Sequence, residues 1–228
     1  MGNQEEIEEE EEEKEKEIEP IQEQEAIKMI LVGNSGVGKT SLINTAKGNN
    51  FKEGAQISTL VCSFIKIELI ISDKKYIINM WDTVGQERFR SLNSVFLKES
   101  NIVIFVFDIT NKKSFNDLDF WFNYIEEELG SDIIKGIIGN KQDLLEDQEI
   151  EDNMIEKYAK EKDIDFTYCS AFTPKVFNDF MKKLVQNYLE KNKNENENIN
   201  QENEIKSKAS IKSLQSNNNK NTKKKRFC

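Results

Sequence analysis

A glycine-rich segment that ends in lysine and threonine is the first part of the chain suited to chemistry. Residues 33–40 read Gly-Asn-Ser-Gly-Val-Gly-Lys-Thr, which fits the pattern G-x-x-x-x-G-K-[ST]. The glycines allow the backbone to wrap closely around phosphates, and backbone N–H groups favour anions. We expect Lys39 to reach the β- and γ-phosphates and the Thr40 hydroxyl to bind Mg²⁺, which prefers oxygen ligands. The alternative is an ordinary glycine-rich turn, and a predicted strand before it and helix after it disfavour that reading.

A second motif discriminates between bases. Residues 140–143 read Asn-Lys-Gln-Asp and follow a predicted strand. The Asp143 carboxylate can accept hydrogen bonds from guanine N1–H and the exocyclic amine, whereas adenine would leave a buried charge unpaired. We expect Asn140 to order the loop and the stem of Lys141 to cover the ring. Alone, the motif could be a polar turn, but its position after a strand favours a guanine site.

Two further segments follow predicted strands. Residues 82–86 read Asp-Thr-Val-Gly-Gln. In this position Asp82 would hold Mg²⁺ through water, the Gly85 N–H would detect a γ-phosphate, and Gln86 would orient an attacking water. Ser170-Ala171 would close over guanine through backbone groups.

Strands and helices alternate along the segment that carries these motifs. Strands are predicted at 27–32, 62–71, 76–81, 102–107, 133–139 and 165–169, with a hairpin turn at 72–75. Helices are predicted at 41–47, from the N-cap Ser114 to Leu129 before Gly130, at 151–161, and from Pro174 to Leu189. This order predicts an α/β fold, with a six-stranded, mostly parallel, doubly wound sheet and helices on both faces. Ligands of such sheets bind at the carboxyl ends of the strands, where the motifs lie.

Charge divides the 228-residue chain into three parts. Residues 1–26 carry thirteen Glu and two Lys, a net charge of −11, whereas residues 191–228 carry a net charge of +6. We expect a disordered acidic extension at 1–25, a P-loop domain at 26–190, and a disordered polar and basic tail at 191–228. An acidic docking tail is the alternative for the first part.

Composition excludes several classes of protein. The chain has no histidine, which excludes histidine-based catalytic triads. Its three scattered cysteines, Cys62, Cys169 and Cys228, disfavour a disulfide framework and a zinc site and indicate a reducing compartment. No secretory signal or membrane-spanning run is found, so we expect a cytoplasmic location.

Residues 27–190 resemble the Ras superfamily of small GTPases, and the Rab branch fits best. The segment from Trp81 to Leu92 is nearly the Rab pattern, and 105–110, 114–115 and Trp121 also match. A weaker similarity in 88–92 and 130–132 is to the Golgi-associated Rab group. The resemblance implies that Thr59 is the switch I threonine, which binds Mg²⁺ and the γ-phosphate.

The resemblance completes the set of predicted site residues. It implies that Phe51 stacks on guanine and that Phe64, Trp81 and Phe96 form an effector-binding triad, for which core aromatics are the alternative. The catalytic residues would be Gln86, Lys39 and Thr59, and the metal ligands Thr40, Thr59 and, through water, Asp82. The predicted nucleotide-binding residues are Asn34, Ser35, Gly36, Val37, Gly38, Lys39, Thr40, Ser41, Phe51, Thr59, Gly85, Asn140, Lys141, Asp143, Ser170 and Ala171.

The chain departs from the Rab pattern at several positions. Leu60 stands where a glycine is usual, Val84 replaces an alanine, and Phe172 replaces a lysine. One residue is inserted between Phe51 and Thr59. The chain ends in a single cysteine, Cys228, after a basic run, which resembles a prenylated Rab tail although two cysteines are usual there. A soluble basic tail is the alternative.

The resemblance implies a molecular switch that binds GTP or GDP with Mg²⁺, hydrolyses GTP slowly without an activating protein, and regulates vesicle trafficking. Its partners would be an exchange factor, a GTPase-activating protein, effectors, a GDP-dissociation inhibitor, a Rab escort protein and a cytosolic membrane surface, with the Golgi as the candidate membrane, but no nucleic acid. Two alternatives stay open: a guanine-nucleotide-binding docking module with negligible hydrolysis, and a signalling GTPase of another branch.

Overall fold

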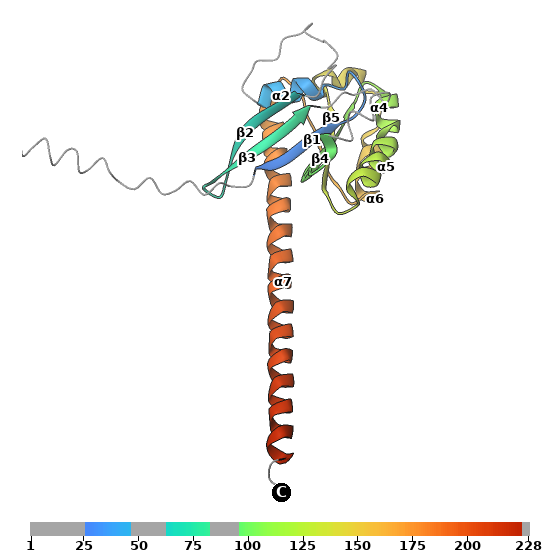
Figure 1. The fold of residues 1–228 in the computed structure, drawn as a ribbon. Coiled ribbons are helices and arrows are strands. Elements are labelled where there is room, and N and C mark those ends of the chain that lie inside the picture. Colours follow the sequence, from blue (N-terminus) through green and yellow to red (C-terminus); the bar gives the residue numbers. More distant parts are fainter. Residues whose placement is uncertain (1–25, 47–62, 83–95, 225–228) are drawn as a thin grey trace, which may run out of the picture.

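A six-stranded sheet forms the centre of the computed structural model, which describes residues 26–46, 63–82 and 96–224 (Figure 1). The strand order is β2-β3-β1-β4-β5-β6. The β2–β3 pair is antiparallel and the remaining neighbours are parallel. The predicted six-stranded, mostly parallel sheet is therefore confirmed. The strands are β1 Ile27–Val32, β2 Ser63–Ile71, β3 Lys74–Asp82, β4 Ile102–Asp108, β5 Ile134–Asn140 and β6 Asp165–Tyr168.

The inner strands form because their sequences are runs of β-branched and aromatic residues that are buried on both faces of the sheet. All seven residues of β4 are buried. A tight turn at Ser72 and Asp73 joins β2 to β3, and both residues have a positive φ, of 48° and 62°. This is the backbone conformation of the two-residue hairpin turns that match strand twist. The turn is shorter than the predicted one, because β3 already begins at Lys74.

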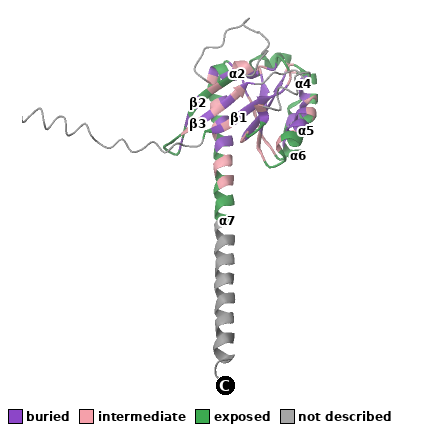
Figure 2. Cartoon of the chain, viewed as in Figure 1, coloured by how far each residue is buried: buried purple, intermediate pink, exposed green. Residues whose placement is uncertain are grey.

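Helices cover both faces of the sheet, and each face has its own hydrophobic cluster (Figure 2). Helices α2 (Lys39–Ala46) and α7 (Pro174–Lys224) pack on one face, where Leu42 and Phe177 belong to one cluster. Helices α4 (Lys112–Asn116), α5 (Leu118–Leu129) and α6 (Asp152–Glu161) pack on the other. Alternate residues of the strands therefore serve both clusters, as a doubly wound sheet requires.

The helix predicted from Ser114 to Leu129 is two helices in the structure, and Ser114 is not its N-cap. Asn111 caps α4, with its side chain accepting a hydrogen bond from the Ser114 N–H. Asp117 separates α4 from α5. Gly130 ends α5 with a φ of 81°, as predicted, because glycine adopts a positive φ without steric cost.

The last helix does not end at Leu189. Helix α7 continues to Lys224 and is 51 residues long, where a disordered tail was predicted from residue 191 (Figure 1). Residues 175–228 contain neither glycine nor proline, so no residue in this segment interrupts the backbone hydrogen bonding of a helix. The Lys193–Glu197 pair, at 4.0 Å, adds an ion pair at helical spacing.

Candidate functional site

The phosphate-binding loop joins β1 to α2, and close contacts require two of its glycines. A Cβ atom at Gly33 would lie 2.1 Å from the backbone oxygen of Val106, and one at Gly38 would lie 2.2 Å from Nδ2 of Asn140. Both glycines have a positive φ, of 144° and 94°. Only glycine therefore allows the loop to pass so close to β4 and to the base motif.

Lys39, the first residue of α2, is folded back over this loop. Its Nζ donates hydrogen bonds to the carbonyl oxygens of Gly33, at 2.8 Å, and Asn34, at 2.9 Å. The residue is only 5% exposed. Burial lowers the pKa of Lys39 from 10.5 to about 8, although the charge of Asp82 opposes this shift. In the described part of the chain the hydrogen bonds of this buried cation go to neutral carbonyl groups, which suits it to an anionic ligand such as a phosphate.

Thr40 and Asp82 bring two oxygen ligands together beside the loop. The Thr40 hydroxyl, at the start of α2, donates to Oδ2 of Asp82 at 2.5 Å, and Asp82 ends β3 with 1% exposure. A hydroxyl and a carboxylate are donors that Mg²⁺ accepts. Over the residues that the structure describes, no group of three or more His, Cys, Asp or Glu side chains could hold a metal. The donor chemistry of the Thr40 hydroxyl and the Asp82 carboxylate fits Mg²⁺, which takes its remaining ligands from phosphates and water.

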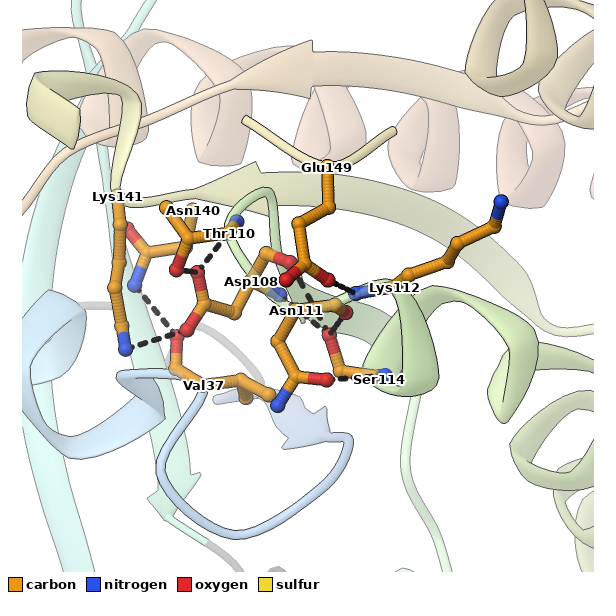
Figure 3. A network of polar contacts seen from close by, with 9 residues as sticks. All are labelled: Val37, Asp108, Thr110, Asn111, Lys112, Ser114, Asn140, Lys141 and Glu149. Atoms are coloured by element: carbon orange, nitrogen blue, oxygen red, sulfur yellow. Dashed lines mark hydrogen bonds and ion pairs between the residues drawn. The ribbon is translucent and has the colours of Figure 1, made fainter. Parts of the chain in front are cut away.

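Asn140 links the base motif to the phosphate-binding loop. It ends β5 and is 2% exposed. Its Nδ2 donates to the carbonyl oxygen of Val37 at 2.7 Å, across 103 residues of sequence (Figure 3). This hydrogen bond is a contact through which Asn140 can order the phosphate-binding loop.

The next residue, Lys141, has a left-handed backbone with a φ of 66°. Its Nζ forms an ion pair with Oδ2 of Asp108 at 2.5 Å (Figure 3). The other carboxylate oxygen of Asp108 accepts hydrogen bonds from the N–H and hydroxyl of Thr110. Both oxygens of the buried Asp108 are therefore satisfied, and the lysine stem is held in one direction.

Asp143 and Ser170 meet at the carboxyl ends of β5 and β6. The Ser170 hydroxyl donates a hydrogen bond to Oδ1 of Asp143, and the Phe172 N–H donates to the same hydroxyl oxygen at 3.1 Å. Ser170 and Ala171 are buried, whereas Asp143 is exposed and Phe172 is 52% exposed. The carboxylate is thus oriented by a residue of the neighbouring loop while it stays open to a ligand.

The loop residues not yet described share the same edge of the sheet. Ser35 and Gly36 are exposed at the tip of the loop, Val37 is buried, and Ser41 is half-buried in the first turn of α2. Among the predicted site residues that are described, the phosphate, metal and base motifs are therefore together at the carboxyl ends of β1, β3, β5 and β6. Five predicted residues lie outside the described part of the chain: Phe51, Thr59, Gly85, Gln86 and Cys228. The departures at Leu60 and Val84 lie there too.

Four residues support the site although sequence reasoning gave them no role in it: Asp108, Ser114, Asp117 and Trp121. Asp108 holds Lys141, and its backbone N–H donates to the Ser114 hydroxyl at 3.0 Å. Asp117 and Trp121 contact the side chain of Asn34. Asp108 had a detectable signal, because it is a carboxylate at the carboxyl end of a predicted strand. The other three contacts depend on how α4 and α5 pack, which the sequence does not reveal.

The three aromatic residues predicted to bind effectors lie in contact. The ring centroids of Phe64 and Trp81 are 5.1 Å apart, and those of Trp81 and Phe96 are 5.6 Å apart. Phe64 is 42% exposed, and Lys28 Nζ lies 5.1 Å from the Trp81 ring centroid. Trp81 and Phe96 are half-buried, so this cluster contributes to packing of the sheet edge, while exposed Phe64 suits a protein contact.

None of the helices in the described residues is both long and apolar enough to cross a membrane.

Comparison with known proteins gives a family match: a family model described as "Ras family" matches residues 28–190. The chain is 38% identical over 148 residues to the mouse "Ras-related protein Rab-26", which covers 65% of this chain and 57% of the mouse protein. It is 37% identical over 148 residues to the human protein of that name, and this alignment covers 65% of this chain and 58% of the human protein.

The matched segment spans less than two thirds of the length of these relatives. The family model, however, covers most of this chain, from β1 into α7. The predicted resemblance to Rab-type proteins is confirmed by the relatives that match. The chain belongs to the Ras family of small GTPases, and it is of the Rab type.

Proposed function

We propose that this protein is a molecular switch that binds GTP and GDP with Mg²⁺ and hydrolyses GTP. The observation that carries the proposal is the arrangement of two separate recognition elements along one sheet edge. The phosphate-binding loop after β1 leads into Lys39 at the start of α2, and Asp143 lies in the short 3-10 helix after β5 (Gln142–Asp147). Asn140, at the end of β5, is bonded to the loop residue Val37. A phosphate site and a guanine site joined in this way match a guanine nucleotide rather than a free phosphate.

Asp143 is the residue that selects guanine. Its carboxylate offers two acceptors to the N1–H and the exocyclic amine of guanine. Ser170 already orients one of these oxygens, so the carboxylate loses little freedom on binding. An adenine base offers no matching pair of donors, and it would leave the charge unpaired. Family membership and the relatives named Rab support the same ligand.

Thr40 and Asp82 are the residues that would hold Mg²⁺, Thr40 directly and Asp82 through water. The ion would neutralise charge on the phosphates when bound. The chain's own residues do the rest: Lys39 binds the β- and γ-phosphates, and the loop N–H groups orient them. In our proposal Thr59 and Gly85 bind the γ-phosphate in the GTP state and Gln86 positions the attacking water.

The cellular role that we propose is the regulation of vesicle trafficking on the cytosolic face of intracellular membranes, including those of the Golgi. The support for this role is the Rab-type similarity and the basic C-terminal sequence that ends in Cys228. Exchange factors, activating proteins and effectors are the kinds of partner that such a switch needs. Phe64, Trp81 and Phe96 are the proposed effector surface, and a lipid on Cys228 is the proposed anchor.

The test is to load the purified full chain with GTP·Mg²⁺ and follow the nucleotide it retains over time. Slow conversion of bound GTP to GDP, faster with an activating protein, is the expected result. Intact GTP in the presence of an activating protein would favour a docking module without hydrolysis. Failure to retain any guanine nucleotide would contradict the proposal.

A matched variant checks the base contact. In Asp143→Asn, one acceptor becomes a donor, which suits xanthine, whose C2 carbonyl replaces the exocyclic amine of guanine. The variant should lose affinity for GDP and gain affinity for xanthosine diphosphate. Equal preference of both proteins for GDP would show that Asp143 does not select the base.

A further inference from the structure

The side chain of Asn34 connects the phosphate-binding loop to the junction of α4 and α5. Its Nδ2 donates to Oδ2 of Asp117 at 2.6 Å, and its Oδ1 accepts a hydrogen bond from Nε1 of Trp121 at 2.8 Å. The partners are 83 and 87 residues away in sequence. Both ends of the amide are therefore used by contacts within the protein.

The same residue also holds the phosphate-binding lysine. The backbone carbonyl of Asn34 accepts one of the two hydrogen bonds from Lys39 Nζ, at 2.9 Å. A change in the position of the side chain therefore moves the peptide unit that orients the lysine. Trp121 is 1% exposed, so its indole N–H would be a costly unpaired donor without Asn34.

The α4 helix touches the other half of the site as well. Its Ser114 hydroxyl binds the backbone of Asp108, the residue that pairs with Lys141. Asp117, at the C-terminal end of α4, also accepts a hydrogen bond from Lys113 at 2.5 Å. The α4–α5 junction is thus joined to the phosphate loop on one side and to the base motif on the other.

We infer that Asn34, Asp117 and Trp121 are positioning residues that hold the phosphate-binding loop closed on the nucleotide and slow its release. This inference rests on the proposed binding of guanine nucleotide. The Lys113 side chain is 78% exposed and that of Asp117 is 32% exposed, so the bridge runs from the surface to Lys39. Loss of one bridging bond leaves one end of the half-buried Asn34 amide without its partner and frees the loop, which we expect to speed release on the order of 10-fold.

The experiment measures the dissociation rate of a fluorescent GDP from the preloaded full chain in excess unlabelled GDP and Mg²⁺. Asp117→Ala removes the acceptor, and Trp121→Phe keeps an aromatic ring but removes the donor. Both should release GDP about 10-fold faster than the unmodified protein. Asp117→Asn retains an acceptor oxygen and should restore a rate near that of the unmodified protein. Asn123→Ala, an exposed change on α5, is the control.

A double variant separates positioning from general stability. If Asp117 acts through Asn34, then Asn34→Ala with Asp117→Ala should release GDP no faster than Asn34→Ala alone. The unfolding midpoint is measured beside each rate, and rates that follow only this midpoint, or that multiply in the double variant, would overturn the inference. If Asp117→Ala does not fold, Asn34→Ala and Trp121→Phe give the same comparison, because Asn34 is only half-buried.

The outcomes also distinguish this inference from the proposed function. If the unmodified chain retains GDP and all bridge variants release it at the unmodified rate, the inference is wrong and the function stands. If the unmodified chain retains no guanine nucleotide, both are wrong.

Discussion

Replacing Gly38 with alanine tests the contact between the phosphate-binding loop and the base motif. The new Cβ would lie 2.2 Å from Nδ2 of Asn140, so this amide must move and lose its 2.7 Å bond to the Val37 carbonyl. Gly130→Ala is the matched control. Gly130 also has a positive φ, 81° against 94° for Gly38, but nothing lies within 4 Å of its Cβ position.

The magnitude follows from two costs. A positive φ destabilises alanine by about 1–3 kcal/mol, and both variants bear a cost of this kind. Only Gly38→Ala also loses the bond from Asn140 and leaves the carbonyl of Val37 without this partner, which costs about 1–3 kcal/mol more. We therefore expect the free energy of unfolding to fall by that additional amount relative to Gly130→Ala.

The assay is urea unfolding of each variant with the same saturating GDP and Mg²⁺, followed by circular dichroism. Asn140→Ala completes the comparison, because it removes both the bond and the side chain that alanine at position 38 would strike. The double variant should be about as stable as Gly38→Ala alone. The reasoning is refuted if Gly38→Ala and Gly130→Ala are equally stable, or if the effects of Gly38→Ala and Asn140→Ala simply add.

Three more outcomes are expected. Bound phosphates should raise the pKa of Lys39 from about 8, so GDP binding should take up more protons at pH 8.5 than at pH 7 and should weaken as the pH rises. Calorimetry in two buffers of different ionisation enthalpy measures this uptake, and equal uptake at both pH values would contradict the prediction. Burial raises the pKa of Cys169 to about 12, so in a variant with Cys62→Ser and Cys228→Ser its thiol should react only as fast as the chain unfolds; rapid labelling of the folded protein would contradict this. Asn196→Pro should interrupt α7 and reduce the helical circular dichroism signal without changing the unfolding midpoint of the domain; an unchanged signal would show that this part of α7 is not helical in solution.

Local patterns predicted much of this fold. The apolar run Ile27–Val32 became β1 with the same bounds, since a short apolar run before a glycine-rich loop has few alternatives. Gly130 ended α5 as predicted, because a residue without a Cβ adopts the positive φ of a helix end whatever its tertiary contacts. The predicted start of α4 was wrong, because Asn111 and Ser114 can both cap a helix. In the structure the Ser114 hydroxyl donates a hydrogen bond to the backbone carbonyl of Asp108, and Asn111 is the N-cap.

The site was predictable to the extent that it is a set of contiguous motifs. The Lys141–Asp108 pair was not predicted, because it depends on the register that places Asp108 beside Asn140 across β4 and β5. The end of α7 was also missed. A polar composition predicts a loop when tertiary contacts are unknown, whereas the absence of glycine and proline only permits a helix and does not demand one.

The continuity of α7 has a mechanical consequence. The helix begins in the core, where Phe177 and Met181 share a hydrophobic cluster with Leu42 and Ile43 of α2, and it then extends well past the domain. At a rise of about 1.5 Å per residue, the part after Leu189 reaches roughly 50 Å. Over its described residues α7 is one uninterrupted helix, and its core segment packs on α2, whose first residues are Lys39 and Thr40. The direction of the helical segment after Leu189 is therefore set by the same packed core that positions the phosphate-binding loop.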